Sequence, residues 1–333
     1  MTHLMGGVSR QACAAAFPPD RFYCLLDELP MHLVAKHVRL ALQRQGDRLQ
    51  ALYLNPDCGL YSAEELPEEI SACRDLVSAF ALQGTIAWVR KSGGASLLPF
   101  WLGRDFERIV RSLRENEPVP ESVPREAQRL LAAAEILVPG TRQAQVQQEE
   151  LTRKTAVLFQ ERGYAPLGDL IHPFHIAALR RYYRYLIRTG AIQLGDRQSA
   201  RRYVAYNEPV ARFFHQQIAA RLSVVAGEAL KPSYVYMASY LSGAELKKHL
   251  DREQCEFSVT LCLDFSPEPD LATPWPIQLE TPKSTVKVYQ ALGDALAYRG
   301  TRLPHYRETL REGQTSTSIF FHYVRSDFTG SIG

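Results

Sequence analysis

The sequence has no apolar run long enough to cross a bilayer, which takes about 20 consecutive apolar residues. Its first ten residues, 1–10, also lack the apolar core of a secretory signal. These absences predict a protein that neither spans a membrane nor is exported. We therefore expect a cytoplasmic protein without a membrane partner.

The six cysteines contain no C-x-x-C pair, and a chain of this size has little need of a disulfide framework. We therefore expect the cysteines to be reduced thiols, as in the cytoplasm. The net charge of +3 is too small to indicate binding to nucleic acid or to an anionic membrane. No internal repeat or low-complexity tract is present, so repeat architectures and disordered arrays are excluded.

The length of 333 residues allows one large or two ordinary domains, and 46% hydrophobic residues can build a sizeable core. Residues 1–145 predict a smaller mixed α/β accessory domain. Apolar spacing there indicates helices over 33–45, 64–80, 106–114 and 125–134, with strands over 49–54, 84–90 and 136–138. This domain could be a packing unit, a peptide-recognition module or a dimerisation module, which leaves a homodimer open.

Residues 151–333 predict a second domain, in which helices precede a series of short strands. Helical spacing covers 151–162, 173–189 and 210–226. Alternating apolar segments separated by Gly and Pro turns predict strands over 233–240, 257–265, 277–280, 286–289, 293–298 and 316–324. Such a series is typical of an antiparallel sandwich or barrel, so the fold class is α+β.

His249 and Asp251 stand two positions apart, with His305 about fifty residues later. Side chains at i and i+2 of an extended strand point the same way, so His249 and Asp251 would face one cavity. A second imidazole from His305 completes a set of two histidines and one carboxylate. That set holds a metal on one face and leaves other positions open, which suits non-haem Fe(II).

Residues 231–328 resemble the 2-oxoglutarate- and Fe(II)-dependent dioxygenases of the prolyl-4-hydroxylase-like superfamily. The matching elements are Tyr240-Leu-Ser-Gly243, His249-Leu-Asp251, Gly293-Asp294, and His305 ahead of a last strand. The resemblance implies a double-stranded β-helix, or jelly roll, with Fe(II), 2-oxoglutarate and O2 as cofactors. It also implies that His249, Asp251 and His305 hold the iron and that Tyr240 contacts the cosubstrate.

The sequence departs from the family where an Arg or Lys normally begins the last strand and pairs with the far carboxylate of 2-oxoglutarate. Residues 312–316 contain no basic residue. Arg307 is the first substitute, because it stands two residues after His305 and so shares its face. Gln314 and Ser316 could still donate hydrogen bonds. Lesser candidates for the cation are Arg299, Arg302 and Lys287.

The resemblance implies hydroxylation of an unactivated C–H in an amino acid, a peptide side chain or a small natural-product intermediate. The carboxylate of Asp251 argues against halogenation, which needs that metal position for chloride. A second hypothesis is a peptide-binding or sensing protein whose barrel has lost cosubstrate binding, favoured by the missing basic residue. Demethylation of nucleic acid is a third, supported only by scattered arginine–aromatic segments.

Overall fold

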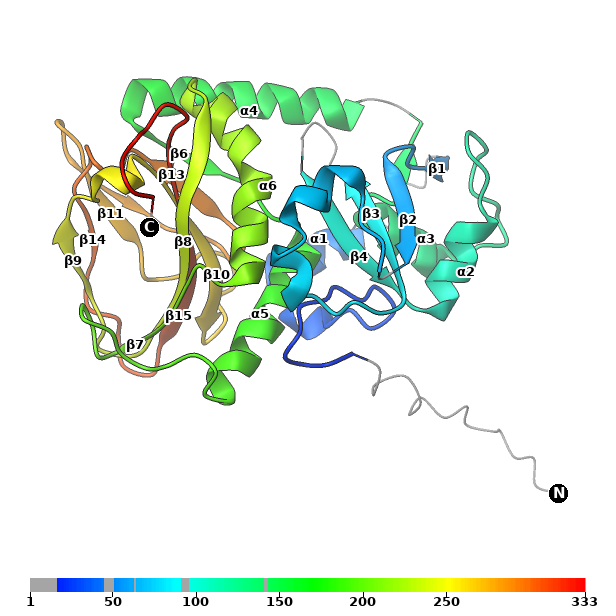
Figure 1. Cartoon of the computed structure of the whole chain (residues 1–333), viewed down its shortest axis with the longest axis horizontal. Helices are drawn as coiled ribbons and strands as arrows, with labels where there is room; N and C mark the ends of the chain where they lie inside the picture. The colour runs from blue at the N-terminus through cyan, green and yellow to red at the C-terminus, as the bar shows by residue number, and fades with distance from the viewer. Residues whose placement is uncertain (1–16, 45–50, 63, 91–95, 141–142, 333) are drawn as a thin grey trace.

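The computed structural model describes residues 17–44, 51–62, 64–90, 96–140 and 143–332 (Figure 1). Two antiparallel sheets dominate the C-terminal part. The larger sheet has the strand order β6–β13–β10–β15–β8–β7. Its strands are β6 (Tyr164–Leu167), β13 (Ala295–Tyr298), β10 (Phe257–Ser266), β15 (Thr315–Arg325), β8 (Leu230–Tyr240) and β7 (Arg202–Tyr206).

The smaller sheet has four strands in the order β12–β11–β14–β9. They are β12 (Thr285–Val288), β11 (Ile277–Glu280), β14 (His305–Arg307) and β9 (Leu246–His249). All six strands predicted after residue 230 are present within a few residues of their predicted bounds. The short strands β6 and β7, which extend the larger sheet at its two edges, were not predicted.

Helices α5 (Pro173–Arg188) and α6 (Pro209–Ala226) pack on the outer side of the larger sheet, and α4 (Gln143–Arg162) runs along one end of it against α6 and β6 (Figure 1). Helix α6 begins sharply because the Glu208 carboxylate accepts hydrogen bonds from the N–H groups of Val210 and Ala211. It ends at Gly227, whose φ of 70° is left-handed and favours glycine. Helix α4 spans the predicted boundary at 145–151, and that boundary stays a prediction.

The N-terminal part contains a three-stranded antiparallel sheet and a separate strand pair. The sheet is formed by β2 (Cys58–Ser62), β3 (Thr85–Arg90) and β4 (Leu97–Leu102), and the pair by β1 (Leu52–Leu54) and β5 (Leu137–Pro139). Helices α1 (Lys36–Arg44), α2 (Arg104–Ser112) and α3 (Arg125–Ala133) agree with prediction. Strand β4 was missed because it contains Pro99, which is tolerated at the edge of a sheet.

The helix predicted over 64–80 is wrong. Two 3₁₀ helices, Glu68–Cys73 and Leu76–Ala79, occupy this segment instead. The Ser71 hydroxyl donates to the Glu68 carbonyl, and the Ser78 hydroxyl donates to the Asp75 carbonyl, each over 2.6 Å. Serine side chains that bind nearby backbone in this way compete with regular helix formation. Apolar spacing alone did not reveal this competition.

The apolar core is continuous between the N-terminal part and the helices that cover the larger sheet. Phe213 of α6 is its clearest link, because its ring lies 5.0 Å from the ring of Phe80 and 6.1 Å from that of Trp88. Phe22 meets Phe214 of the same helix in an edge-to-face contact at 5.8 Å. No described helix has the length and apolar content that a bilayer span requires.

We expect Phe213→Ala to lower the free energy of unfolding by about 3–5 kcal/mol, because it removes a fully buried ring from the shared core. Urea unfolding followed by circular dichroism measures the change. The control is Val224→Ala on the same helix, where 58% of the residue is exposed, and this change should stay within about 0.5 kcal/mol. Equal effects of the two substitutions would contradict a shared core.

Candidate metal centre

The backbone of the smaller sheet brings His249 and His305 opposite one another. Strands β9 and β14 pair antiparallel, with His305 directly across from His249. Asp251 lies two residues beyond His249, and its N–H donates to the Gly300 carbonyl at 3.0 Å. This bond turns the chain after β9, so that the carboxylate faces both imidazoles.

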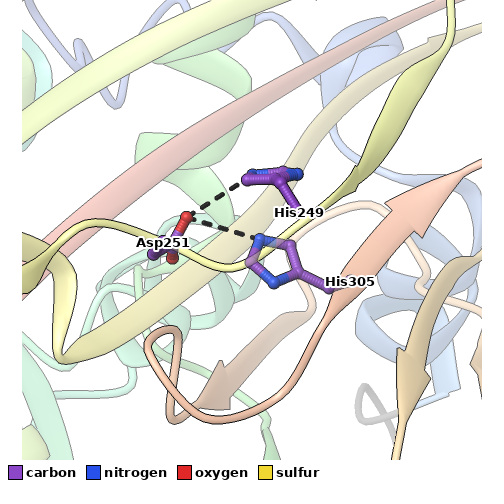
Figure 2. A group of neighbouring side chains, drawn as sticks. All are labelled: His249, Asp251 and His305. Atoms are coloured by element: carbon purple, nitrogen blue, oxygen red, sulfur yellow. Dashed lines mark ion pairs between the residues drawn. The ribbon is translucent and has the colours of Figure 1, made fainter.

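The three side chains converge on a single point (Figure 2). The Oδ1 atom of Asp251 lies 3.5 Å from Nε2 of His249 and 3.5 Å from Nε2 of His305. The two ring centroids are 4.4 Å apart. Ligand atoms from all three residues lie within 4.8 Å of one another. This spacing is compact enough for one ion to contact all three.

Backbone carbonyls fix which nitrogen of each imidazole is free. Nδ1 of His249 lies 2.7 Å from the Lys247 carbonyl, and Nδ1 of His305 lies 3.0 Å from the Leu303 carbonyl. A carbonyl only accepts, so each Nδ1 carries the proton and donates it. The Nε2 lone pairs are left facing Asp251. Metal-binding histidines show this arrangement, in which the second nitrogen is held by an outer partner.

The site is electrostatically ready for a cation. Burial by itself would raise the pKa of the Asp251 carboxyl, but its interactions with the facing His249 and His305 imidazoles outweigh burial and hold that pKa well below its usual value. Side-chain exposure is 39% for His249 but only 10% for Asp251 and 3% for His305. The group therefore has one open side, at His249, and a carboxylate that stays ionised.

Tyr240 and Arg307 both lie inside the C-terminal part, next to one another. The Trp275 ring contacts Tyr240 edge to face at 5.2 Å, and the Arg307 guanidinium lies 4.9 Å from the centroid of the same ring. Arg307 donates to the Trp275 carbonyl at 2.5 Å and to Oε1 of Gln290 at 3.2 Å. His305 and Arg307 sit on one short strand, so the cation is close to the metal group.

Arg307 is buried without a negative partner among the described residues, and its Nε atom has no hydrogen-bond partner there. Burial lowers the pKa of this arginine, although the group stays charged near neutral pH. A buried cation is costly unless an anion or strong acceptors surround it. The chemistry of the position therefore favours a bound anion.

The remaining predicted site residues have different surroundings. Ser316 is buried and lies opposite Tyr240 in the β8–β15 ladder, whereas Gln314 is partly exposed, and its backbone carbonyl accepts from the Ser242 hydroxyl. The lesser cation candidates lie elsewhere or are occupied. Arg299 pairs with Glu228 at 3.4 Å, Lys287 with Glu308 at 3.6 Å, and Arg302 is exposed.

Sequence reasoning missed three polar residues on the inner face of the larger sheet: Ser258, Thr260 and Arg202. Thr260 is fully buried, and its hydroxyl has no hydrogen-bond partner in the described part of the chain. Arg202 pairs with Asp196 and donates to the Tyr240 hydroxyl at 3.3 Å. One signal was available: small polar residues alternate with apolar ones at the start of β10, which indicates a polar inner face.

No protein-family model matches the sequence, and no curated protein matches it. Several solved structures resemble about half of the chain. A prolyl-4-hydroxylase from Pseudomonas putida is 14% identical, with 52% of this chain and 99% of that chain covered and a TM-score of 0.43. A prolyl hydroxylase from Trichoplax adhaerens, in complex with a hypoxia inducible factor peptide fragment, is 12% identical, with 55% and 94% covered and a TM-score of 0.46.

A 2OG-Fe(II) oxygenase family oxidoreductase from Burkholderia pseudomallei is 14% identical, with 54% of this chain and 92% of that chain covered and a TM-score of 0.42. At TM-scores below 0.5 these likenesses are too weak to assign a function.

Gly300→Ala should weaken Fe(II) and Co(II) binding by about tenfold or more, because it displaces Asp251. A Cβ atom at position 300 would overlap the Asp251 carboxylate and lie 2.6 Å from the Cys255 carbonyl and 2.7 Å from the Ser258 hydroxyl. Calorimetric titration of the metal-free protein measures the affinity. Gly168→Ala, where an added Cβ meets no atom within 4 Å, is the control. Wild-type affinity in Gly300→Ala would show that Asp251 is not a ligand.

Proposed function

We propose that this chain is an Fe(II)- and 2-oxoglutarate-dependent oxygenase. The observation that carries the proposal is the convergence of Nε2 of His249, Nε2 of His305 and Oδ1 of Asp251 on one point. Two neutral imidazoles and one carboxylate, grouped on one side of an ion, are the ligand set of non-haem Fe(II) oxygenases. In this proposal the six- and four-stranded sheets form a double-stranded β-helix around the site.

The buried cation supports 2-oxoglutarate as the cosubstrate. Its far carboxylate would pair with Arg307, which has the planar fork that binds carboxylates and no acidic partner of its own among the described residues. Tyr240, Thr260 and Ser316 would offer hydroxyl groups nearby, with Gln314 a further donor at the start of the last strand. Arg307 thus takes the place of the basic residue missing from 312–316.

In this proposal the chain's own residues bind the iron, orient the cosubstrate and exclude water from the site. When bound, Fe(II) and 2-oxoglutarate supply O2-dependent oxidation coupled to decarboxylation of the 2-oxo acid. The Lys247 and Leu303 carbonyls keep both imidazoles in the tautomer that offers Nε2. Arg307 sets the direction of the cosubstrate, and the aromatic residues between the sheets exclude water. The open side at His249 is where a substrate would enter.

Hydroxylation of an unactivated C–H is the reaction we propose, because Asp251 keeps the position that a halogenase would leave to chloride. The substrate would be an amino acid, a peptide side chain or a small natural-product intermediate. Residues 1–145 would act as an accessory unit, through substrate contacts or homodimer formation, and 151–333 as the oxygenase domain of a cytoplasmic protein.

A peptide-binding or sensing protein without cosubstrate is the second candidate. The observation that favours it is the absence of a basic residue from 312–316. In that case Arg307 would be a structural cation held by the Trp275 carbonyl and Gln290 alone. The two candidates differ in whether iron-loaded protein binds 2-oxoglutarate.

His249→Ala and Asp251→Ala should abolish iron retention, because each removes one of three ligands. Anaerobic wild-type protein loaded with Fe(II) should develop a visible absorption band when 2-oxoglutarate is added, and neither variant should. His37→Ala, a change of the same kind outside the site, should retain the band. If iron-loaded wild-type protein never develops the absorption band, the cosubstrate assignment is wrong and the peptide-binding or sensing function is favoured.

Arg307→Met should raise the concentration of 2-oxoglutarate needed to half-saturate that band by about tenfold or more, since a bond to a charged group contributes about 1.5–3 kcal/mol. Iron affinity should change little. Arg108→Met on the exposed face of α2 is the control for loss of one positive charge. An unchanged midpoint in Arg307→Met would show that Arg307 does not bind the cosubstrate.

A further inference from the structure

The two oxygens of the Asp251 carboxylate have different surroundings. Oδ1 faces the imidazoles of His249 and His305 at 3.5 Å from each Nε2 atom. Oδ2 faces away from them and accepts a hydrogen bond from the Ser258 hydroxyl at 2.7 Å. The backbone at Gly300 closes this second side, since even a Cβ there would overlap Oδ2. The carboxylate is thus held in one rotational position.

The Ser258 hydroxyl is itself directed by His322. Its Oγ atom lies 2.9 Å from Nδ1 of His322 and 3.3 Å from the Cys255 carbonyl. A hydroxyl has one proton, and the bond to the charged carboxylate is the shortest and strongest of the three that it could donate. Ser258 therefore donates to Asp251 and accepts from His322. Burial lowers the pKa of His322 to about 4, so the ring is neutral, with its proton on Nδ1.

Both residues are fixed by the larger sheet. Ser258 and His322 lie directly opposite one another in the β10–β15 ladder, and both are buried. The His322 ring also packs against the rings of Tyr234 at 4.7 Å and Tyr236 at 5.7 Å. This support means that the larger sheet, which supplies no proposed metal ligand, still sets the orientation of Asp251.

The same atoms belong to a hydrogen-bonded group around Ser258. Ligand atoms of Asp251, Cys255 and His322 do lie within 4.8 Å of one another. The Ser258 hydroxyl already bonds to two of these side chains, at 2.7 and 2.9 Å. Asp251 and His322 of this group are joined through hydrogen bonds to the Ser258 hydroxyl.

We propose that Ser258 and His322 are positioning residues that restrict Asp251 to a single metal-facing oxygen, Oδ1. The inference rests on the proposed function and deepens it. A carboxylate that turned to offer both oxygens would lose the Ser258 bond inside a buried site. Binding through one oxygen leaves an additional position on the ion, which a cosubstrate with two donor atoms requires. Neither residue touches the ion in this account.

The primary test is Ser258→Ala, examined without cosubstrate. We expect about tenfold weaker Fe(II) binding in calorimetric titration and a changed visible absorption spectrum of the Co(II)-loaded protein, because outer partners of metal ligands typically contribute 10–100-fold. The control is Ser239→Ala on β8, another buried serine, whose hydroxyl accepts from Thr317 at 2.8 Å and does not contact Asp251. It should retain the wild-type affinity and spectrum.

A double-mutant cycle distinguishes positioning from general damage to the sheet. His322→Phe keeps a ring at this place but removes the Nδ1 donor, so it should weaken Fe(II) binding less than Ser258→Ala does. Because His322 acts through Ser258, adding His322→Phe to Ser258→Ala should cause almost no further loss. Additive losses, or wild-type affinity and spectrum in Ser258→Ala, would overturn the inference. Wild-type protein that binds no Fe(II) would instead overturn the proposed function itself.

Discussion

The antiparallel pairing of β9 with β14 is the constraint on which the rest of the site depends. It sets His305 across from His249 and lets the chain turn at Asp251 toward both rings. Backbone carbonyls then select the free nitrogen of each imidazole. The Nε2 atoms of both imidazoles are therefore positioned by main-chain geometry before any ligand arrives. A site organised in this way loses little free energy to reorganisation when an ion binds.

The larger sheet contributes in a different way. Its outer face packs on α5 and α6, whose aromatic residues continue the core into the N-terminal part. Its inner face carries buried polar groups at Ser258, Thr260 and His322, and Arg307 on the smaller sheet is buried as well. Oγ1 of Thr260, Nε2 of His322 and Nε of Arg307 have no hydrogen-bond partner in the described part of the chain, and such buried groups lower stability unless a ligand supplies a partner. Apolar packing of the helices on the outer face of the sheet offsets the loss of stability caused by these buried polar groups.

The convergence of His249 and Asp251 and the strand series were predictable because they depend on local spacing. His249 and Asp251 share a face through the two-residue period of an extended chain, and alternating apolar residues marked β8, β10 and β15. The segment 64–80 was not predictable, because serine–backbone bonds and packing against the core outweighed helical spacing. Strand β4 was hidden by Pro99, which only its place at a sheet edge permits.

The sequence by itself identified the candidate metal ligands, since two imidazoles and a carboxylate at this spacing predict one metal site with open positions, and the resemblance implied Fe(II) as its metal. It also identified Arg307 as the candidate cation for binding the cosubstrate, because Arg307 stands two residues after His305 and so shares its face of the strand. Only the tertiary structure decided that Arg307 is buried without an acidic partner among the described residues, and that Ser258 and His322 hold one oxygen of Asp251. Burial and contacts between distant strands depend on how the two sheets pack, and local spacing along the chain carries no information about that.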